Sequence, residues 1–323
     1  MIHRPLVSVI TVNFNQAEAT GALLDSIRRQ EYDAVEVIVV DNGSVDDPAP
    51  FFAARYPEVI LIRSENNLGF AGGNNLGLQH ASGRYFFFVN NDAELTTGCI
   101  ARLTELFQSV PDLGIVSPLL CFPPEPNSDT VVQYAGMTRV AALTGRNRII
   151  GEGEKDSGQF QWPVQTAYAH GAAMLVSRKV LEHAGPMDEA YFLYYEELDW
   201  CERIRRAGYS VWVEPRARVY HRESLTVNKT GALKTYFLHR NRVLFMRRNF
   251  RGLQLGVFYL FLLLLTVPKN VIKLWRRGET ENLEAFLLGI RWNFFPGKPN
   301  RFENMRSTNS GVLAKNTPDM VHL

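Results

Sequence analysis

The chain has 323 residues, of which 46% are hydrophobic and 21% are charged, so it is long enough for one large globular domain or two smaller ones. Its formal net charge of +2 excludes an overall basic coat for nucleic acid, and we expect no nucleic-acid partner. The three cysteines are widely spaced and leave an odd thiol, which suits a reducing compartment. The N-terminus lacks the long apolar stretch of a secretory signal, so we expect this part of the chain to stay in the cytosol.

Short apolar runs rich in β-branched and aromatic residues alternate with helical patterns in the N-terminal part of the chain. Such runs are typical of buried parallel strands. Their alternation with helices predicts an α/β fold with a doubly wound, mostly parallel, Rossmann-like sheet. The expected strands span residues 6–12, 35–40, 59–62 and 85–89, and the expected helices span 17–30, 50–56 and 74–80.

Polar segments follow the expected strands, at residues 13–15, 41–44, 64–67 and 90–92. Ligands of open α/β sheets bind in the crevice outside the carboxyl ends of the strands, so these segments should surround a ligand. Asp41 can accept a hydrogen bond from a base or ribose hydroxyl there, although a turn-forming or capping role explains an aspartate equally well. Asp92 is a candidate ligand for magnesium or manganese, which often take only one or two protein carboxylates; a helix N-cap is the alternative.

Residues 65–77 (ENNLGFAGGNNLG) are rich in Gly and Asn, which allows the backbone to approach a phosphate-bearing ligand at a helix N-terminus. The glycine spacing fails the GxGxxG pattern of dinucleotide-binding proteins, and a P-loop is absent from the sequence. The missing pattern disfavours an oxidoreductase with a Rossmann fold.

Glu196, Glu197 and Asp199 lie together between an aromatic segment and a helical one. A carboxylate beside an apolar wall can have a raised pKa and act as a general base for a hydroxyl group. Favourable charge at a helix N-terminus accounts for one of the three acids, but not for all of them. His221 ends a strand-like segment and can ligate the same metal as Asp92, whereas a structural role is the alternative for it and for His170.

Residues 121–165 are rich in Pro and Gly without clear periodicity and are interpreted as a long loop or flap, a kind of segment that often sets substrate specificity. Ordered structure is expected to resume at residues 171–177, followed by a helix over 198–207 and a strand over 210–213.

The C-terminal part is basic and apolar. A basic helix is expected over residues 233–250, followed by an apolar run over 257–267 that ends at Pro268. A membrane span needs about 20 apolar residues, so this run favours an interfacial or re-entrant helix on an anionic membrane surface; a core helix is the alternative. The basic residues of this region are Lys234, Arg240, Arg242, Arg247, Arg248, Arg251, Lys269, Lys273, Arg276 and Arg277.

Six motifs in order (SVITVNFN, VIVVDNGSVDD, NNLGFAGGNNLG, FFFVNNDAEL, HGAAMLVSR and FLYYEELDWCERIRRAGY) resemble those of family 2 glycosyltransferases. The resemblance covers residues 6–224 and implies a GT-A fold. It implies a catalytic domain at residues 1–230, with nucleotide-sugar binding in about 1–120 and the acceptor side in about 165–230. Residues 231–323 would then form a helical, membrane-associating extension, similar to that of rhamnosyltransferase-like members.

The resemblance also implies roles for individual residues on the donor side. Asp41 would read the nucleobase, and Asn13 and Asn75 would line the donor site. Asn91 and Asp92 belong to the motif that binds the nucleotide sugar, and Asp92 would hold magnesium or manganese on the diphosphate, with His221 as a second ligand. The family motif is frequently Asp-x-Asp, whereas here it is Asn90-Asn91-Asp92.

On the acceptor side, the resemblance implies that Glu197 is the catalytic base, although the family's usual residue is Asp, and Glu196 and Asp199 stay as alternatives. The Gln-x-x-Arg-Trp motif of processive synthases is missing after the acidic cluster, which suggests a single addition. The chain is therefore expected to be an inverting glycosyltransferase at the cytoplasmic face of the cell membrane. It would move a hexose or deoxyhexose, such as rhamnose, from a dTDP- or UDP-sugar to a lipid-linked or polysaccharide acceptor.

Two other functions stay open. A nucleotide-sugar-binding scaffold of a glycan assembly complex, without turnover, fits a metal motif in which Asn90 stands in place of the first aspartate. A peripheral membrane adaptor would leave the acids at the strand ends unexplained. The sequence does not indicate an oligomeric state.

Overall fold

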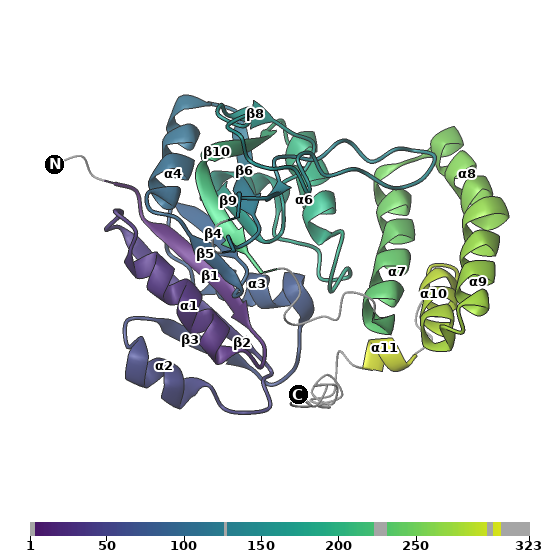
Figure 1. The fold of residues 1–323 in the computed structure, drawn as a ribbon, viewed down its shortest axis with the longest axis horizontal. Coiled ribbons are helices and arrows are strands. Elements are labelled where there is room, and N and C mark those ends of the chain that lie inside the picture. Colours follow the sequence, from purple (N-terminus) through teal and green to yellow (C-terminus); the bar gives the residue numbers. More distant parts are fainter. Residues whose placement is uncertain (1–3, 126–127, 223–230, 296–299, 305–323) are drawn as a thin grey trace.

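The computed structural model describes residues 4–125, 128–222, 231–295 and 300–304. A central sheet with helices packed against it forms one side of the molecule, and the helices of the C-terminal residues form the other (Figure 1).

The strands follow the order β3-β2-β1-β4-β9-β6-β10-β5, with β7 beside β6 and β8 beside β10. β1 to β4 pair in parallel, as do β6 and β10, whereas β9 runs antiparallel to β4 and β6. The sheet is mixed but mostly parallel, which confirms the predicted fold class. The strands are β1 (Val7–Asn13), β2 (Val35–Asn42), β3 (Ile60–Ser64), β4 (Tyr85–Val89), β5 (Ala93–Leu95), β6 (Leu113–Cys121), β7 (Val132–Tyr134), β8 (Val164–Gln165), β9 (Ala173–Ser177) and β10 (Ser210–His221).

The predicted helices are present, most of them with boundaries close to those expected. The helix at the glycine-rich segment begins at residue 69 instead of 74. The helices are α1 (Ala17–Arg28), α2 (Ala49–Arg55), α3 (Gly69–Gln79), α4 (Cys99–Ser109), α5 (Arg178–Ala184), α6 (Glu196–Arg206), α7 (Ala232–Asn249), α8 (Gly252–Phe261), α9 (Val267–Arg276), α10 (Thr280–Trp292) and α11 (Arg301–Asn304).

The glycines of α3 let this helix lie close against the sheet. A Cβ atom on Gly77 would lie 2.6 Å from a side-chain carbon of Ile10, and one on Gly73 would lie 3.0 Å from Val12. These two glycines therefore serve packing, not the ligand approach suggested by the sequence. Gly69 has a φ of +73°, and its backbone lies against Phe192, so it joins α3 to the turn before α6.

The expectation of a long loop at residues 121–165, here called the flap, is only partly right. The flap contains β7 and β8, and isolated bridges join Val131 to Lys155, Met137 to Ile149 and Ala141 to Arg146. Such short pairings leave no periodicity in the sequence, because each strand covers too few residues. The flap reaches across to the C-terminal helices (Figure 1). A Cβ atom on Gly145 of the flap would lie 3.1 Å from Arg242 and 3.0 Å from Phe258.

The apolar C-terminal run is longer than predicted, because Pro268 does not end it. One helix, here called the arm helix, spans Gly252–Arg276 with 25 residues, comprising α8, a π turn (Leu262–Thr266) and α9. In the π turn the Val267 N–H bonds to the Leu262 carbonyl, and the wider turn accommodates a proline that has no N–H. An 18-residue window of the arm helix has a mean hydropathy of 1.9 and is 17% buried, so it is long and apolar enough to cross a membrane and is not a core helix.

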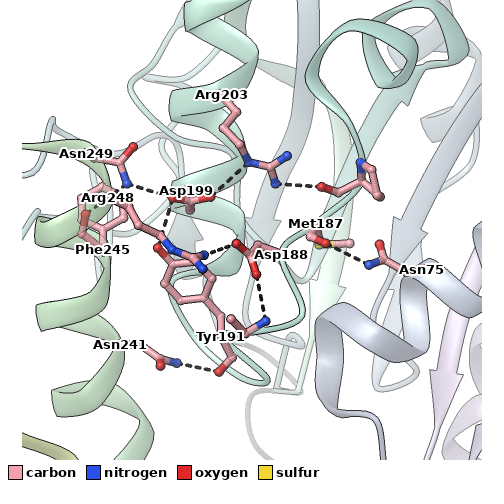
Figure 2. Close-up of polar contacts among 12 residues, drawn as sticks. Asn75, Met187, Asp188, Tyr191, Asp199, Arg203, Asn241, Phe245, Arg248 and Asn249 are labelled. Atoms are coloured by element: carbon pink, nitrogen blue, oxygen red, sulfur yellow. Dashed lines mark hydrogen bonds and ion pairs between the residues drawn. The ribbon is translucent and has the colours of Figure 1, made fainter. Parts of the chain in front are cut away.

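Some basic residues of the C-terminal part are buried or bound to other groups of the protein. Arg240 is fully buried and donates to the Ala190 carbonyl at 2.8 Å, and Arg247 donates to the Asn293 carbonyl at 2.8 Å. Arg248 pairs with Asp188 (Figure 2). The crowding of cations in the sequence therefore overstates the positive charge available to an anionic surface.

The turn before α6 has a strained backbone. Phe192, Tyr194 and Tyr195 have φ values of 64°, 69° and 73°, a region that costs a non-glycine residue about 1–3 kcal/mol. Asn241 of α7 stabilises this turn, because its Nδ2 lies 2.7 to 2.9 Å from the carbonyl oxygens of Tyr191, Leu193 and Tyr194. Figure 2 shows α7 beside the turn.

We expect Asn241→Ala to lower the free energy of unfolding by about 3 kcal/mol, because it leaves buried carbonyl groups without donors. Chemical denaturation followed by circular dichroism measures this change. The control is Asn66→Ala, which removes an exposed side chain and should change stability by less than about 0.5 kcal/mol. Equal effects of the two substitutions would show that Asn241 does not hold the turn.

Candidate active site

A cleft of about 350 Å³ lies at the carboxyl ends of β1, β2 and β4. The first turn of α3, the turn before α6, the flap and α7 complete its walls. The predicted candidates Asn91, Asp92, Glu196, Glu197 and His221 all line it. The other lining residues include Val12, Phe14, Asn42, Asn67, Gly69, Phe70, Asn74, Asn90, Gln133, Ile149, Glu152, His170, Gly171, Phe192, Tyr194, Leu233 and Lys234.

Asp92 and His221 lie together on one wall of the cleft. His221 Nε2 is 3.2 Å from Asp92 Oδ1, and both side chains are buried. His221 Nδ1 lies 2.9 Å from Gln133 Oε1, an acceptor, so the Nδ1 atom carries the proton in the neutral ring. The Nε2 lone pair is then directed at the Asp92 side, where the Asn90 amide lies 3.3 Å away.

This pair suits a cation that also binds a ligand. Asp92 Oδ1 is buried and accepts no hydrogen bond, which is costly unless a cation or donor occupies the position. Within the described ranges no three His, Cys, Asp or Glu side chains are grouped as a metal site. A divalent ion held by Asp92 and His221 would take its remaining ligands from phosphate oxygens and water, as magnesium often does.

His170 also lines the cleft and lies beside His221, with ring centroids 6.2 Å apart. Burial lowers the pKa of His170 to about 3, and its Nδ1 accepts a hydrogen bond from the Ala172 N–H at 3.1 Å. It is therefore a neutral ring that supports the wall.

Glu196 is buried and Glu197 is half-buried at the first turn of α6, and each has a buried Oε2 atom without a hydrogen bond. Burial raises the pKa of Glu197 to about 7. Burial, together with the charge of Glu197, also raises the pKa of Glu196. A carboxylate that titrates near neutral pH, and that has one oxygen without a hydrogen bond, is suited to accept a proton from a hydroxyl group.

Asp199 lies outside the cleft. Its carboxylate accepts hydrogen bonds from Tyr191 at 3.1 Å, Arg203 at 3.1 Å and Asn249 at 2.8 Å (Figure 2). This aspartate joins α6 to α7, and its oxygens are already committed.

Asp41 and Asn13 are fully buried beside the cleft, next to lining residues of the same strands. Asp41 Oδ1 accepts from Asn13 at 3.0 Å and from Ser44 at 2.5 Å. Asp41 Oδ2 lies 3.3 Å from Arg63 Nε, a partner that the sequence did not reveal because it comes from the neighbouring strand β3.

Asn75 and Asn91 have different environments. Asn75 does not line the cleft and donates to the Met187 carbonyl at 2.9 Å and to Glu189 at 3.0 Å, while its neighbour Asn74 lines the cleft. Asn91 lines the cleft and donates to Thr20 at 3.2 Å, which fixes it against α1.

Gln133 and Lys234 line the cleft but were not among the predicted site residues. Gln133 lies in β7 within the flap, where no motif marks it. Lys234 lies in the first turn of α7, and its ammonium lies 5.9 Å from the centre of the Tyr194 ring. The run of cations that starts at Lys234 was the available signal for it.

Residues 8–185, more than half of the chain, match the model of the family described as Glycosyl transferase family 2. A hexosyltransferase of Haloferax volcanii, named for low-salt glycan biosynthesis, is 26% identical over 74% of this chain and 74% of that protein. The N-acetylglucosaminyl-diphospho-decaprenol L-rhamnosyltransferase of Mycobacterium tuberculosis is 24% identical over 76% of this chain and 86% of that protein. The chain spans 28% of the length of another relative, the uncharacterized protein y4gI of Sinorhizobium fredii, with 26% identity over 76% of this chain.

Solved structures share the fold at low sequence identity. The mannosyltransferase PcManGT of Pyrobaculum calidifontis, in complex with GDP-Man and Mn2+, has a TM-score of 0.56 at 17% identity and covers 92% of this chain and 89% of its own. GalNAc-T7 with UDP, GalNAc and Mn2+ has a TM-score of 0.59 at 16% identity and covers 70% of this chain and 45% of its own. These neighbours confirm the GT-A fold. The family match shows that the chain belongs to glycosyl transferase family 2, and with the named relatives it shows a nucleotide-sugar-dependent glycosyltransferase.

Proposed function

We propose that the protein is an inverting glycosyltransferase that adds a single hexose or deoxyhexose, such as rhamnose, to a lipid-linked or polysaccharide acceptor. The observation that carries the proposal is the pair of buried carboxylates, Glu196 and Glu197, in the same cleft as Asp92 and His221. The two glutamates are suited to accept a proton, and Asp92 with His221 is suited to hold a diphosphate through a cation.

In the proposed reaction, Glu197 takes the proton of an acceptor hydroxyl as its oxygen attacks the anomeric carbon of the donor sugar. The bond from that carbon to the diphosphate oxygen breaks, and the nucleoside diphosphate leaves with the electron pair. Attack opposite the leaving group inverts the anomeric centre in one displacement and needs no enzyme nucleophile. Glu197 is the favoured base because burial raises its pKa to about 7, whereas burial and the charge of Glu197 together raise the pKa of Glu196 well above its usual value.

The donor would be a dTDP- or UDP-sugar, bound along the carboxyl ends of β1, β2 and β4. Asp41, fixed by Asn13 and Arg63, would read the base, and Asn91 would lie beside the diphosphate. Asp92 and His221 would hold magnesium or manganese. When bound, the ion supplies positive charge that offsets the charge developing on the leaving diphosphate. Asn75 would act only through the turn that it holds at Met187.

The acceptor would reach the cleft from the cytoplasmic face of the membrane. The Mycobacterium relative is named for a lipid-linked substrate. The arm helix presents large exposed side chains, with Leu253, Leu260 and Leu264 at 83%, 61% and 68% exposure. A contiguous apolar face of this kind on a helix with flanking cations is suited to a membrane interface.

A nucleotide-sugar-binding scaffold without turnover is the second candidate. The motif Asn90-Asn91-Asp92 favours it, because it has one aspartate fewer than Asp-x-Asp and leaves Asp92 and His221 as the two candidate metal ligands. Binding of a donor without release of nucleoside diphosphate, across a panel of nucleotide sugars and membrane lipid extract, would support it.

We expect Glu197→Gln to lower kcat on the order of 10³-fold while donor affinity stays within about twofold, because only proton removal is lost. In the wild type, kcat/KM should fall as the pH drops below about 7, since a protonated Glu197 cannot accept a proton. Initial rates of nucleoside diphosphate release measure both effects.

The matched control is Glu182→Gln, which neutralises an exposed glutamate of α5. It should keep both the rate and its pH dependence. An active Glu197→Gln variant would assign the base to Glu196 instead.

We expect chelation with EDTA to abolish transfer and manganese to restore it. Asp92→Asn should raise the manganese concentration needed for half-maximal activity by about tenfold or more, because it removes the charged ligand. Asp112→Asn, at an exposed aspartate, serves as the control and should not change it. Full activity of the metal-free wild type would contradict the metal assignment.

We expect the double substitution Leu260→Glu and Leu264→Glu to weaken binding to anionic vesicles by about a hundredfold, because two exposed leucines are replaced by charges. Vesicle co-sedimentation measures the partition. Trp162→Glu, at a flap residue with 74% exposure, is the control. Equal binding of all three proteins would exclude the arm helix as the membrane contact.

A further inference from the structure

Arg242 of α7 is a buried cation that forms no ion pair with the residues that the structure describes. Its exposure is 3%, and both Nε and Nη2 lack a hydrogen bond. Burial lowers its pKa to about 10. A buried guanidinium with unsatisfied N–H groups costs several kcal/mol unless an anion compensates it.

A second arginine lies beside it. The flap residue Gly145 packs against Arg242, with its Cβ position 3.1 Å from Arg242 Cγ, and the next residue in the chain is the exposed Arg146. The Tyr195 hydroxyl donates to the Gly145 carbonyl at 3.1 Å and so fixes this part of the flap. Neither arginine forms an ion pair with any carboxylate of the described residues.

The neighbouring histidine does not neutralise or add to this charge. His239 Nδ1 donates a hydrogen bond to the Thr235 carbonyl oxygen at 2.9 Å. Burial and the positive charges of Arg242 and Arg146 lower its pKa to about 4, so the ring is neutral. The pair Arg242 and Arg146, here called the arginine pair, is thus positive and uncompensated.

The arginine pair lies between the cleft and the arm helix. Tyr195, which touches the flap beside the pair, is bracketed in the chain by Tyr194 and Glu196, which line the cleft. On the other side, the Gly145 Cβ position is 3.0 Å from the ring of Phe258 in α8. An acceptor with its sugar at Glu197 and its lipid on the arm helix would therefore lie near the arginine pair between these two ends.

We propose that the arginine pair binds the phosphoryl group that joins the sugar and the lipid of a lipid-linked acceptor. This inference rests on the proposed function and specifies the acceptor as a lipid phosphate or diphosphate. Arginine is suited to the task because its planar fork of N–H groups matches phosphate oxygens and stays charged when buried. The phosphate would supply the negative charge that the buried Arg242 guanidinium lacks among the described residues.

Binding of farnesyl diphosphate to the full chain, measured by calorimetry, tests the site without turnover. Wild type should bind it at least about tenfold more tightly than either farnesol or inorganic pyrophosphate. Arg242→Met and Arg146→Gln should each weaken that binding by about tenfold, whereas Arg148→Gln, an exposed arginine of the same flap, should not.

Three results would overturn the proposal. Equal binding of pyrophosphate would indicate a site for free phosphate. Unchanged farnesyl diphosphate binding in both arginine variants would exclude the pair. If the two arginine variants lose binding to phosphatidylglycerol vesicles but still bind farnesyl diphosphate, the arginine pair contacts lipid headgroups only.

Thermal stability separates this role from a structural one. Arg242→Met removes an uncompensated buried charge but keeps the long side chain, so its Tm should equal or exceed that of the wild type. A lower Tm for Arg242→Met, without a binding defect in Arg146→Gln, would assign Arg242 to packing.

Kinetics separate failure of this inference from failure of the proposed function. Substitution of Arg146 should raise KM for a polyprenyl-diphospho-sugar about tenfold more than KM for the same sugar as a neutral alkyl glycoside. Equal effects on both acceptors would overturn the arginine pair while leaving transfer established. Absence of transfer to either acceptor in the wild type would instead contradict the proposed function.

Discussion

The strained turn at residues 191–195 determines the geometry of the candidate active site. Three residues with positive φ end this segment and aim α6 so that Glu196 and Glu197 enter the cleft. Strain of this kind persists only where the surroundings hold it. Asn241 supplies donors to its carbonyl groups, and Gly69 allows α3 to lie against Phe192. Both acids follow this turn directly, and burial of their carboxyl groups raises their pKa values.

The same constraint connects the C-terminal helices to the chemistry. Helix α7 provides Asn241 to the turn, Lys234 to the cleft and Arg242 to the flap contact. The arm helix is joined directly to α7 and packs partly on it, while much of its surface is exposed. We propose that the residues after 230 contribute to the site as well as to membrane contact, since Leu233 and Lys234 line the cleft. We infer that acceptor lipid, acceptor phosphate and catalytic base are arranged along one continuous set of contacts.

The sequence was informative where local pattern decides structure. The apolar runs of β1 to β4 and the polar residues after them predicted the sheet and the place of Asp92, because strand ends of a parallel sheet converge. Asp199 and Asn75 could not be distinguished from cleft residues, since their partners Asn249 and Met187 are remote in the chain. The arm helix was predicted too short because a π turn at Leu262–Thr266 accommodates Pro268. In the sequence, Arg242 does not differ from the other cations of the C-terminal part. The structure distinguishes it, because its side chain is buried and two of its nitrogen atoms have no hydrogen bond.

The central claim is that Glu197 activates an acceptor for direct attack on the donor sugar. The most direct test is the anomeric configuration of the product, determined by NMR with a donor of known configuration. A product with the opposite configuration is the predicted result. A product that keeps the configuration of the donor would contradict a single displacement with Glu197 as base.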